Sequence, residues 1–175
     1  VLHSEGDGQL PLQWEVEHGV TVVATGGQEY RGNVYLFGQH PRVLTQLELE
    51  KRLTEAPDEA RHLNEVVMIQ CVWSPAQKVD YCSRTCCTNT MKNAIALKQL
   101  NPDCKVYVLY KDLITYGFRE EYYTEARRRG VIFLRYTDET RPEVQSVDGR
   151  LRVTVDDLIL KEKLMLRGRF CDILW

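Results

Sequence analysis

Hydrophobic positions in the middle of the chain follow two spacings, one typical of buried strands and one typical of helices. Residues 66–72 (VVMIQCV) are almost continuously apolar, which is typical of a strand buried on both faces of a parallel sheet. Residues 86–100 carry apolar side chains at helical spacing and stop before Asn101 and Pro102. A strand, a helix and a strand follow at about 105–110, 118–129 and 131–136. This β-α-β-α-β order predicts a Rossmann-like α/β unit with a parallel sheet and right-handed crossovers.

The flanking segments predict further strands and one more helix. Alternation at residues 12–16 and the short apolar run 20–23 indicate β structure within the first 40 residues. Thr45 with Glu48 three residues later predicts a capping box that opens a helix over about 46–54. Near the other end, an Asp-Gly pair at 148–149 predicts a hairpin turn within a β-meander. These elements complete a three-layer α/β unit.

Composition narrows the classes of protein that this chain can be. Its 175 residues suit about one domain, and 23 basic against 25 acidic residues give a net charge of −2. This balance argues against a nucleic-acid or anionic-membrane partner, and no run of 18 apolar residues exists to span a membrane. The first residue is Val1, no secretory signal follows, and the chain ends on an apolar stretch (171–175). We interpret the sequence as an excerpt of a longer cytoplasmic protein.

Four of the six cysteines lie close together, and their position indicates redox or metal chemistry. They are Cys71 at the end of the first buried strand, and Cys82, Cys86 and Cys87 where the next helix begins. A dinucleotide-binding Rossmann unit carries G-x-G-x-x-G at this turn, and the motif is missing here. The backbone N–H groups of a helix N-terminus still favour an anion, and a [4Fe-4S] cluster held by four thiolates is one. The four cysteines are therefore predicted to ligate a [4Fe-4S] cluster, with Cys82 and Cys86 on one face of a helical turn.

Other interpretations of these residues stay open. Zinc also takes four cysteines, although its usual pairs with two to four residues between them do not match this series. The alternative function is therefore a zinc-binding or metal-free scaffold that docks partner redox subunits, and a third is an atypical pyridine-nucleotide domain. Cys104 and Cys171 lie at or within predicted strands, where buried inert thiols are expected. Lys92 is either an ordinary solvated helix lysine or a cationic group near a cofactor.

The sequence resembles the A subunits of heterodisulfide reductases, a flavin- and iron-sulfur-containing family. The resemblance extends over at least residues 19–136, and the Cys-Ser-Arg-x-Cys-Cys group is its most specific part. Two departures stand out, because the chain carries no FAD-binding G-x-G-x-x-G and has Trp73 where a glycine is expected. The matching segments are GVTVVATGG (19–27), HPRVLTQL (40–47), MIQCV (68–72), YCSRTCCT (81–88), MKNA (91–94), VYVLYK (106–111) and TYGFREE (115–121).

This resemblance implies a thioredoxin-reductase-like core, the architecture of FAD/NAD-linked disulfide oxidoreductases. Residues 1–64 would be a partial FAD-domain segment with its connection, and residues 65–175 the Rossmann-like equivalent of the NAD domain. The implied site places Thr25 and Gly26 beside FAD, a [4Fe-4S] cluster on Cys71, Cys82, Cys86 and Cys87, and Lys92 near the isoalloxazine. The implied function is electron transfer between FAD and [4Fe-4S] clusters in an oxidoreductase subunit, complete only in the longer protein. Implied partners are other heterodisulfide reductase subunits and ferredoxin or hydrogenase-type electron carriers.

Overall fold

A parallel sheet of five strands forms the centre of the computed structural model, which describes residues 15–26, 29–72, 82–166 and 170–173. Across the sheet the strands follow the order β1 (Val43–Leu44), β8 (Phe170–Ile173), β2 (Glu65–Ile69), β3 (Lys105–Tyr110) and β4 (Ile132–Arg135). The register pairs Glu65 with Lys105 and Ile69 with Leu109, so β2 and β3 end side by side. Strands from both ends of the described chain therefore meet in one sheet.

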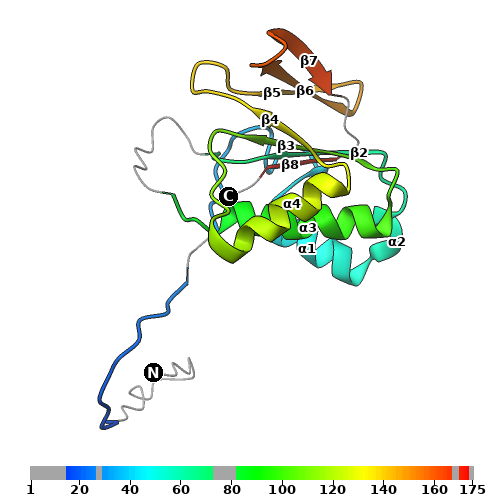
Figure 1. Cartoon of the computed structure of the whole chain (residues 1–175). Coiled ribbons are helices and arrows are strands. Elements are labelled where there is room, and N and C mark those ends of the chain that lie inside the picture. The colour runs from blue at the N-terminus through cyan, green and yellow to red at the C-terminus, as the bar shows by residue number, and fades with distance from the viewer. Residues whose placement is uncertain (1–14, 27–28, 73–81, 167–169, 174–175) are drawn as a thin grey trace.

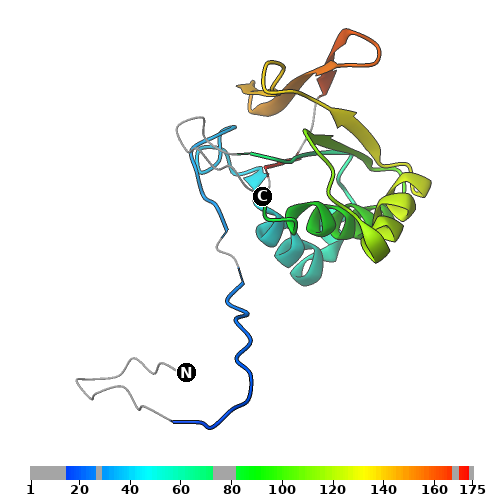
Figure 2. The ribbon, with the colours of Figure 1, turned by 60° about the vertical axis from the view of Figure 1, so that its left-hand side comes forward.

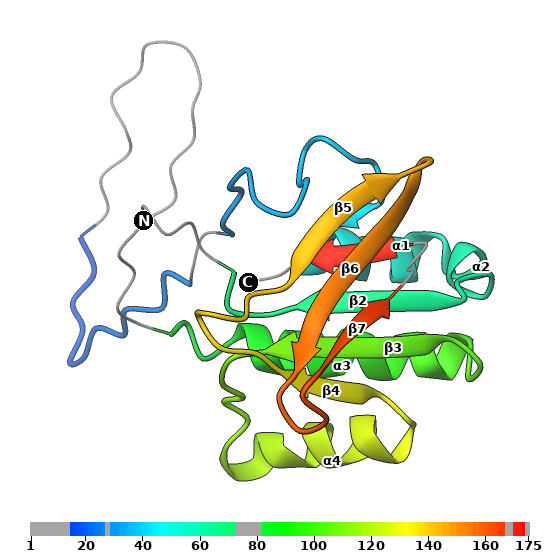
Figure 3. The same ribbon diagram turned by 90° about the horizontal axis from the view of Figure 1, so that it is seen from above.

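Helices cover one face of this sheet and a small antiparallel sheet covers the other (Figure 1). The helices are α1 (Gln46–Glu55), α2 (Pro57–Ala60), α3 (Cys86–Leu100) and α4 (Glu120–Arg128), with a 3-10 turn η1 (Gly117–Arg119) before α4. The small sheet is a meander of β5 (Glu143–Val147), β6 (Arg150–Asp157) and β7 (Glu162–Leu166). Seen from above, the meander crosses over β2, β3 and β4 (Figure 3). The predicted α/β class and three-layer arrangement are confirmed.

Strand β2 contributes side chains to two hydrophobic cores, because successive side chains point to opposite faces of the sheet. Val66 and Met68 are fully buried in the core under the helices. Val67 and Ile69 are fully buried in the second core, which lies between the sheet and the meander. Burial on both faces explains the nearly continuous apolar run that predicted this strand.

Local signals in the sequence set several element boundaries. The Thr45 hydroxyl accepts from the backbone N–H of Glu48 (3.2 Å), and the Glu48 carboxylate accepts from the N–H of Thr45 (3.0 Å). This capping box opens α1 one residue after Thr45, as predicted. The predicted bounds of α3 and β3 are also confirmed. At the hairpin between β5 and β6, Asp148 and Gly149 both have positive φ (52° and 69°), as a two-residue type I′ turn requires.

The predicted strand at residues 20–23 is wrong. Residues 15–26 contain no strand and run away from the sheet and its helices as an extended segment (Figure 2). Val20, Val22 and Val23 expose 79–81% of their surface there, because none of the described strands pairs with them. Part of the other predicted strand, at residues 12–14, lies outside the described residues.

The predicted division of the chain at residue 64 stays a prediction. In this structure β1 and α1, from the first part, join the same sheet and helix layer as the elements that follow residue 64. In the part of the chain that the structure describes, no helix has the length and apolar character needed to cross a membrane.

Candidate functional site

Three segments that carry the cysteines and their neighbours meet at the carboxyl edge of the central sheet. Gln70 and Cys71 follow β2, α3 begins at Cys86, and residues 112–114 follow β3. Because β2 and β3 are parallel neighbours, their carboxyl ends open on the same edge. The helix that follows a strand in a crossover connection begins at the carboxyl edge of the sheet. This edge is where ligands bind in open α/β sheets.

The backbone carbonyl of Asp112 lies between two of the predicted ligand cysteines. Its oxygen is 3.9 Å from the Sγ of Cys71 and 3.9 Å from the Sγ of Cys87, so both sulfurs lie at the same carbonyl. The backbone N–H of Ile114 donates to the Cys87 Sγ at 3.4 Å. The fold thus brings a cysteine from the strand end and one from the helix N-terminus to the same short loop.

Cys82 lies outside the helix, which corrects the prediction that it shares a helical face with Cys86. Helix α3 begins only at Cys86, with Thr85 as its N-cap residue. Arg84 has a positive φ of 58°, so the backbone turns sharply between the two cysteines and cannot be α-helical there. The backbone N–H of Arg84 donates to the exposed Cys82 Sγ (3.3 Å), and the Arg119 guanidinium donates to the Arg84 carbonyl (3.3 Å). A fixed loop therefore presents Cys82 toward solvent.

The buried thiols of Cys86 and Cys87 share one hydrogen bond and have opposite pKa shifts. The Cys87 thiol donates to Cys86, which lowers the pKa of Cys86; the Ser83 hydroxyl and backbone groups of the first turn lower it further, against burial. The pKa of Cys87 is raised by that same bond and by burial. Without a bound metal, Cys86 is therefore the more readily ionised thiol of the two.

Cys71 has a strained backbone and electrostatic contact with the other cysteines. Its φ is 58°, a left-handed value that costs a non-glycine residue on the order of 1 kcal/mol or more and is found often at functional sites. Burial raises the pKa of the Cys71 thiol, negative charge on Cys86 and Cys82 raises it further, and backbone hydrogen bonding at Asp112 and Lys111 opposes the rise. Each of the four predicted ligands thus interacts electrostatically with at least one of the others.

Three buried side-chain atoms beside these cysteines lack hydrogen-bond partners. The amide of Gln70 is fully buried, and neither its Nε2 nor its Oε1 is bonded; the hydroxyl of Thr88 is in the same state. Within the described residues, these are the buried side-chain polar atoms without a partner. Gln70 precedes Cys71 and Thr88 follows Cys87, so both flank the cysteine group. Such atoms often mark a place where a bound group supplies the missing partner.

The cysteine group contains the thiol ligands of an iron-sulfur site, but they do not form a coordination shell for a single metal ion. Among the residues described, no three His, Cys, Asp or Glu side chains are gathered into a coordination shell for a single metal ion. Cys71 and Cys87 nevertheless meet at the Asp112 carbonyl, and Cys86 is hydrogen-bonded to Cys87. Soft thiolates such as these are the ligands that iron-sulfur clusters and zinc prefer. A cubane cluster is larger than one ion, and its sulfurs accept hydrogen bonds from buried donors. The residues present therefore fit a [4Fe-4S] cluster.

Of the three residues predicted beside a flavin, two lie on the extended segment 15–26 and one lies on α3. Thr25 and Gly26 are exposed on the extended segment before residue 27 (Figure 2). Lys92 is half exposed on α3, and its Nζ lies 2.7 Å from the Glu50 carboxylate of α1. The assignment of these three residues to a flavin site stays a prediction.

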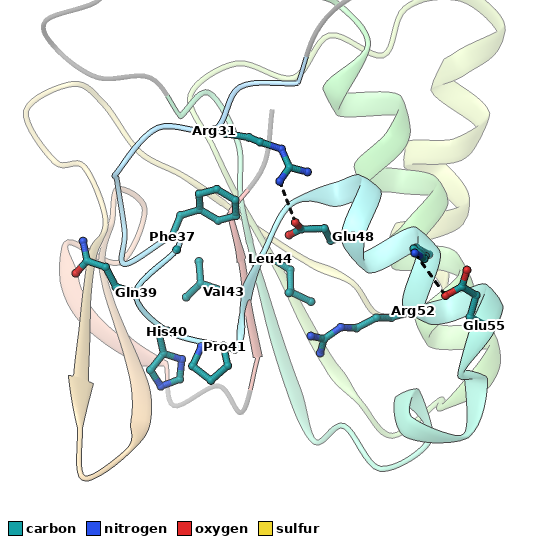
Figure 4. A pocket seen from close by; sticks show the side chains of 12 residues that line it. Arg31, Phe37, Gln39, His40, Pro41, Val43, Leu44, Glu48, Arg52 and Glu55 are labelled. Carbon is teal, nitrogen blue, oxygen red and sulfur yellow. Dashed lines mark ion pairs between the residues drawn. The ribbon is translucent and has the colours of Figure 1, made fainter. Parts of the chain in front are cut away.

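A hollow on the described surface lies elsewhere, between residues 31–44 and α1 (Figure 4). Its volume is about 840 Å³, and its floor includes the apolar side chains of Phe37, Val43 and Leu44. Ion pairs already join Arg31 to Glu48 (3.4 Å) and Lys51 to Glu55 (3.9 Å) at its rim. None of the predicted site residues lines it.

The structure also adds residues that sequence reasoning missed. Asp112, Ile114 and Gln70 surround the cysteines, and the Tyr136 hydroxyl donates to the Gln70 carbonyl. All four residues lie just after the carboxyl ends of strands. Because sites in α/β proteins form at the carboxyl edge of parallel strands, the positions after each predicted strand could have indicated them. Cys104 is fully buried, as predicted. Cys171 lies in β8 as predicted, but its side chain lies outside the described residues.

Comparison with known proteins gives a family for this sequence and independent support for its fold. No family model matches the chain. It is 35% identical to the iron-sulfur A subunit of the CoB–CoM heterodisulfide reductase of Methanocaldococcus jannaschii, over 88% of this chain and 26% of that protein. It is 34% identical to the A subunit of the ferredoxin/F(420)H(2)-dependent CoB–CoM heterodisulfide reductase of Methanosarcina acetivorans, over 85% and 21%. The chain thus spans about a quarter of the length of these relatives.

Among solved structures, thioredoxin reductase from T. acidophilum matches with a TM-score of 0.53 at 12% identity, over 86% of this chain and 41% of that one. The L-lysine 6-monooxygenase of Pseudomonas syringae also reaches 0.53, at 8% identity, over 84% and 43%. At these identities the likeness concerns the fold alone, and it agrees with the parallel sheet and helices described above. The identity of 34–35% to these sequence relatives over most of the chain shows that this chain belongs to the family of heterodisulfide reductase A subunits.

Proposed function

We propose that this chain holds a [4Fe-4S] cluster and serves as an electron-transfer segment of an oxidoreductase of the heterodisulfide reductase A-subunit type. The observation that carries the proposal is the convergence of Cys71 and Cys87 on the Asp112 carbonyl, each at 3.9 Å. Cys86 and Cys82 complete the set, because both influence the pKa of Cys71.

Each cysteine has a distinct part in this proposal. Cys86 and Cys87 lie in the first turn of α3, where the positive end of the helix dipole stabilises the negative charge of ligand thiolates. Cys71 anchors the site to the sheet, and the exposed Cys82 closes it on the solvent side. The bound cluster would supply one-electron chemistry close to the protein surface.

Flavin chemistry belongs, in this proposal, to the longer protein. The chain covers about a quarter of its relatives, Thr25 and Gly26 are exposed on the extended segment, and Lys92 pairs with Glu50. These three residues therefore have no part in the electron transfer proposed for this chain. Electron transfer between FAD and clusters, and association with other reductase subunits, ferredoxin or hydrogenase-type carriers, are proposed for the longer protein as a whole.

Anaerobic reconstitution tests the cluster. The chain is incubated with iron and sulfide, and bound iron, acid-labile sulfide and the EPR spectrum of the reduced protein are measured. The proposal expects about four iron atoms per chain in the wild type and a large loss in Cys86→Ser. Cys104→Ser is the matched control, because Cys104 is buried in the core beneath the helices and its Sγ bonds the Lys105 carbonyl, away from the cysteine group. This variant should keep its iron.

Two outcomes would overturn the assignment. Equal iron in Cys86→Ser and Cys104→Ser would show that the cysteine group does not hold the metal. One tightly bound zinc per chain, with no visible absorption and no cluster formed, would instead support the zinc-binding scaffold. Flavin released from the same samples is measured by fluorescence, and stoichiometric FAD in this chain alone would contradict our assignment of flavin binding to the longer protein.

A further inference from the structure

Gln70 has a side chain that the protein buries without giving it anything to bind. Its exposure is 0%, and both amide atoms lack hydrogen-bond partners among the described residues. Burying an unpaired amide opposes folding, so native proteins rarely keep one without a reason. The next residue is Cys71, one of the proposed cluster ligands.

The backbone of Gln70 is held from two sides. Its N–H donates to the Leu109 carbonyl (2.7 Å), which continues the β2–β3 ladder by one residue. Its carbonyl accepts from the hydroxyl of Tyr136, a residue that is itself buried. The side chain is therefore the main part of Gln70 with hydrogen-bonding capacity left, and the backbone cannot easily move to satisfy it.

Strand alternation places this side chain on the helix side of the sheet. Val66 and Met68 belong to the core beneath the helices, and Gln70 continues the same face one step nearer the carboxyl edge. Met68 shares that core with Met91 of α3. Helix α3 begins at the carboxyl edge of the sheet and runs in the direction opposite to β2 (Figure 1). The two residues from Met68 to Gln70 advance the strand by about 6.6 Å, close to the rise of about 5.4 Å of one helical turn. Gln70 therefore lies level with the turn of α3 one turn before Met91, which holds Cys87 and Thr88.

We propose that the Gln70 amide N–H donates a hydrogen bond to a sulfur of the iron-sulfur cluster. This inference rests on the proposed function, because it requires the cluster. A buried donor stabilises the more negatively charged, reduced cluster more than the oxidised one, so it raises the reduction potential. Gln70 thus acts on the driving force for electron transfer, whereas the cysteines hold the metal.

The test compares the wild type with Gln70→Leu, which keeps most of the side-chain volume and removes the amide. Gln99→Leu is the matched control, because Gln99 is exposed near the far end of α3. Each chain is reconstituted anaerobically, its iron is counted, and its midpoint potential is measured by EPR-monitored titration. The expectation is equal iron in all three and a more negative potential in Gln70→Leu alone. The shift should be about tenfold in the reduction equilibrium, or about 59 mV for one electron.

Two further measurements keep this inference separate from the proposal on which it rests. If the wild type forms no cluster, the proposed function fails; if all three chains bind equal iron at one potential, only the role of Gln70 fails. In the metal-free chain, Gln70→Leu should raise the melting temperature because it removes an unpaired buried amide. A lower melting temperature would overturn the inference, since it would mean that the amide already has a structural partner. Gln70→Met, a flexible apolar substitute, should reproduce the potential shift if Gln70→Leu packs poorly.

Discussion

The thiol of Cys104 gives the stability of this protein a dependence on alkaline pH. Cys104 is fully buried in the core beneath the helices, and its Sγ donates to the neighbouring Lys105 carbonyl (3.8 Å). Burial raises the pKa of Cys104 from 9.0 to about 11, although the nearby charge of Lys98 opposes the rise. The thiol therefore stays protonated in the folded chain at pH values where the unfolded chain has already lost that proton.

The sign of the effect follows from this difference. Below pH 9 both states keep the proton, so the full stability is present; between pH 9 and 11 only the unfolded state releases it, so the free energy of unfolding falls. The loss approaches about 2–3 kcal/mol at about 1.4 kcal/mol per pH unit. Cys104→Ser removes the titrating group, so urea unfolding from about pH 8 to about pH 10.5 should show a steeper decline for the wild type. Parallel declines for the two proteins would contradict the prediction.

At the level of single residues, the sequence singled out four cysteines but not their surroundings. Cysteine spacing and the missing glycine motif are local features, so they pointed to Cys71, Cys82, Cys86 and Cys87 before the fold was known. Asp112 and Ile114 join the site only because β3 pairs with β2, a contact between strands that are far apart in the sequence. The orphaned amide of Gln70 was invisible as well, since burial and missing partners are properties of the packed chain.

Between helices α1 and α3, a buried polar network replaces part of the apolar core. The Gln46 amide donates to the Thr90 hydroxyl (2.8 Å), and the Asn93 amide donates to the Gln46 carbonyl (3.1 Å) and to its side-chain oxygen (2.5 Å). All three residues are buried, with exposures of 3% or less. Because every bond crosses between the two helices, the network fixes how α1 sits on the helix whose N-terminus carries the cysteines.

Asn93→Ala is expected to destabilise the protein by about 2–4 kcal/mol. The substitution leaves the Gln46 side-chain oxygen and backbone carbonyl without their buried donor, and each unsatisfied group costs about 1–3 kcal/mol. Asn89→Ala is the control on the same helix, since Asn89 is only half-buried and lies outside this network. Urea unfolding followed by circular dichroism measures both. Equal stabilities in the two variants would mean that the network adds nothing to α1–α3 packing.

At the level of elements, local chemistry predicted most boundaries. A capping box fixes the start of α1 and an Asp-Gly turn fixes the hairpin, because both depend on residues that are close in the sequence. The prediction that Cys82 shares a helical turn with Cys86 was wrong, because Arg84 has a positive φ and the helix begins only after it. No glycine or proline in this segment indicates the break in the sequence. Prediction also failed at residues 20–23, whose valines favour a strand but find no partner among the described strands.

At the level of the whole molecule, the meander and the site share the same strands. Leu151, Val153 and Val155 of β6 are buried against the face of the sheet opposite the helices, in one core with Val67 and Ile69 of β2. Strand β2 also leads directly into the segment that carries the first site cysteine. Alternation in the sequence predicted the meander, but which face it covers depends on long-range packing that no local pattern encodes.

If the meander and the sheet form one cooperative unit, a cavity in the meander should weaken the whole fold. Leu151→Ala removes a side chain that is 1% exposed and should lower the free energy of unfolding by about 2–5 kcal/mol. Leu160→Ala is the control, because Leu160 is 61% exposed in the β6–β7 turn and this substitution should change stability by less than about 0.5 kcal/mol.

Amide hydrogen exchange then distinguishes a single cooperative unit from a meander that unfolds on its own. In a single unit, Leu151→Ala accelerates exchange in β2 and β3 as much as in β6, because all three open only by global unfolding. Faster exchange in β6 alone would mean that the meander unfolds independently and that the cysteine edge of the sheet does not depend on it.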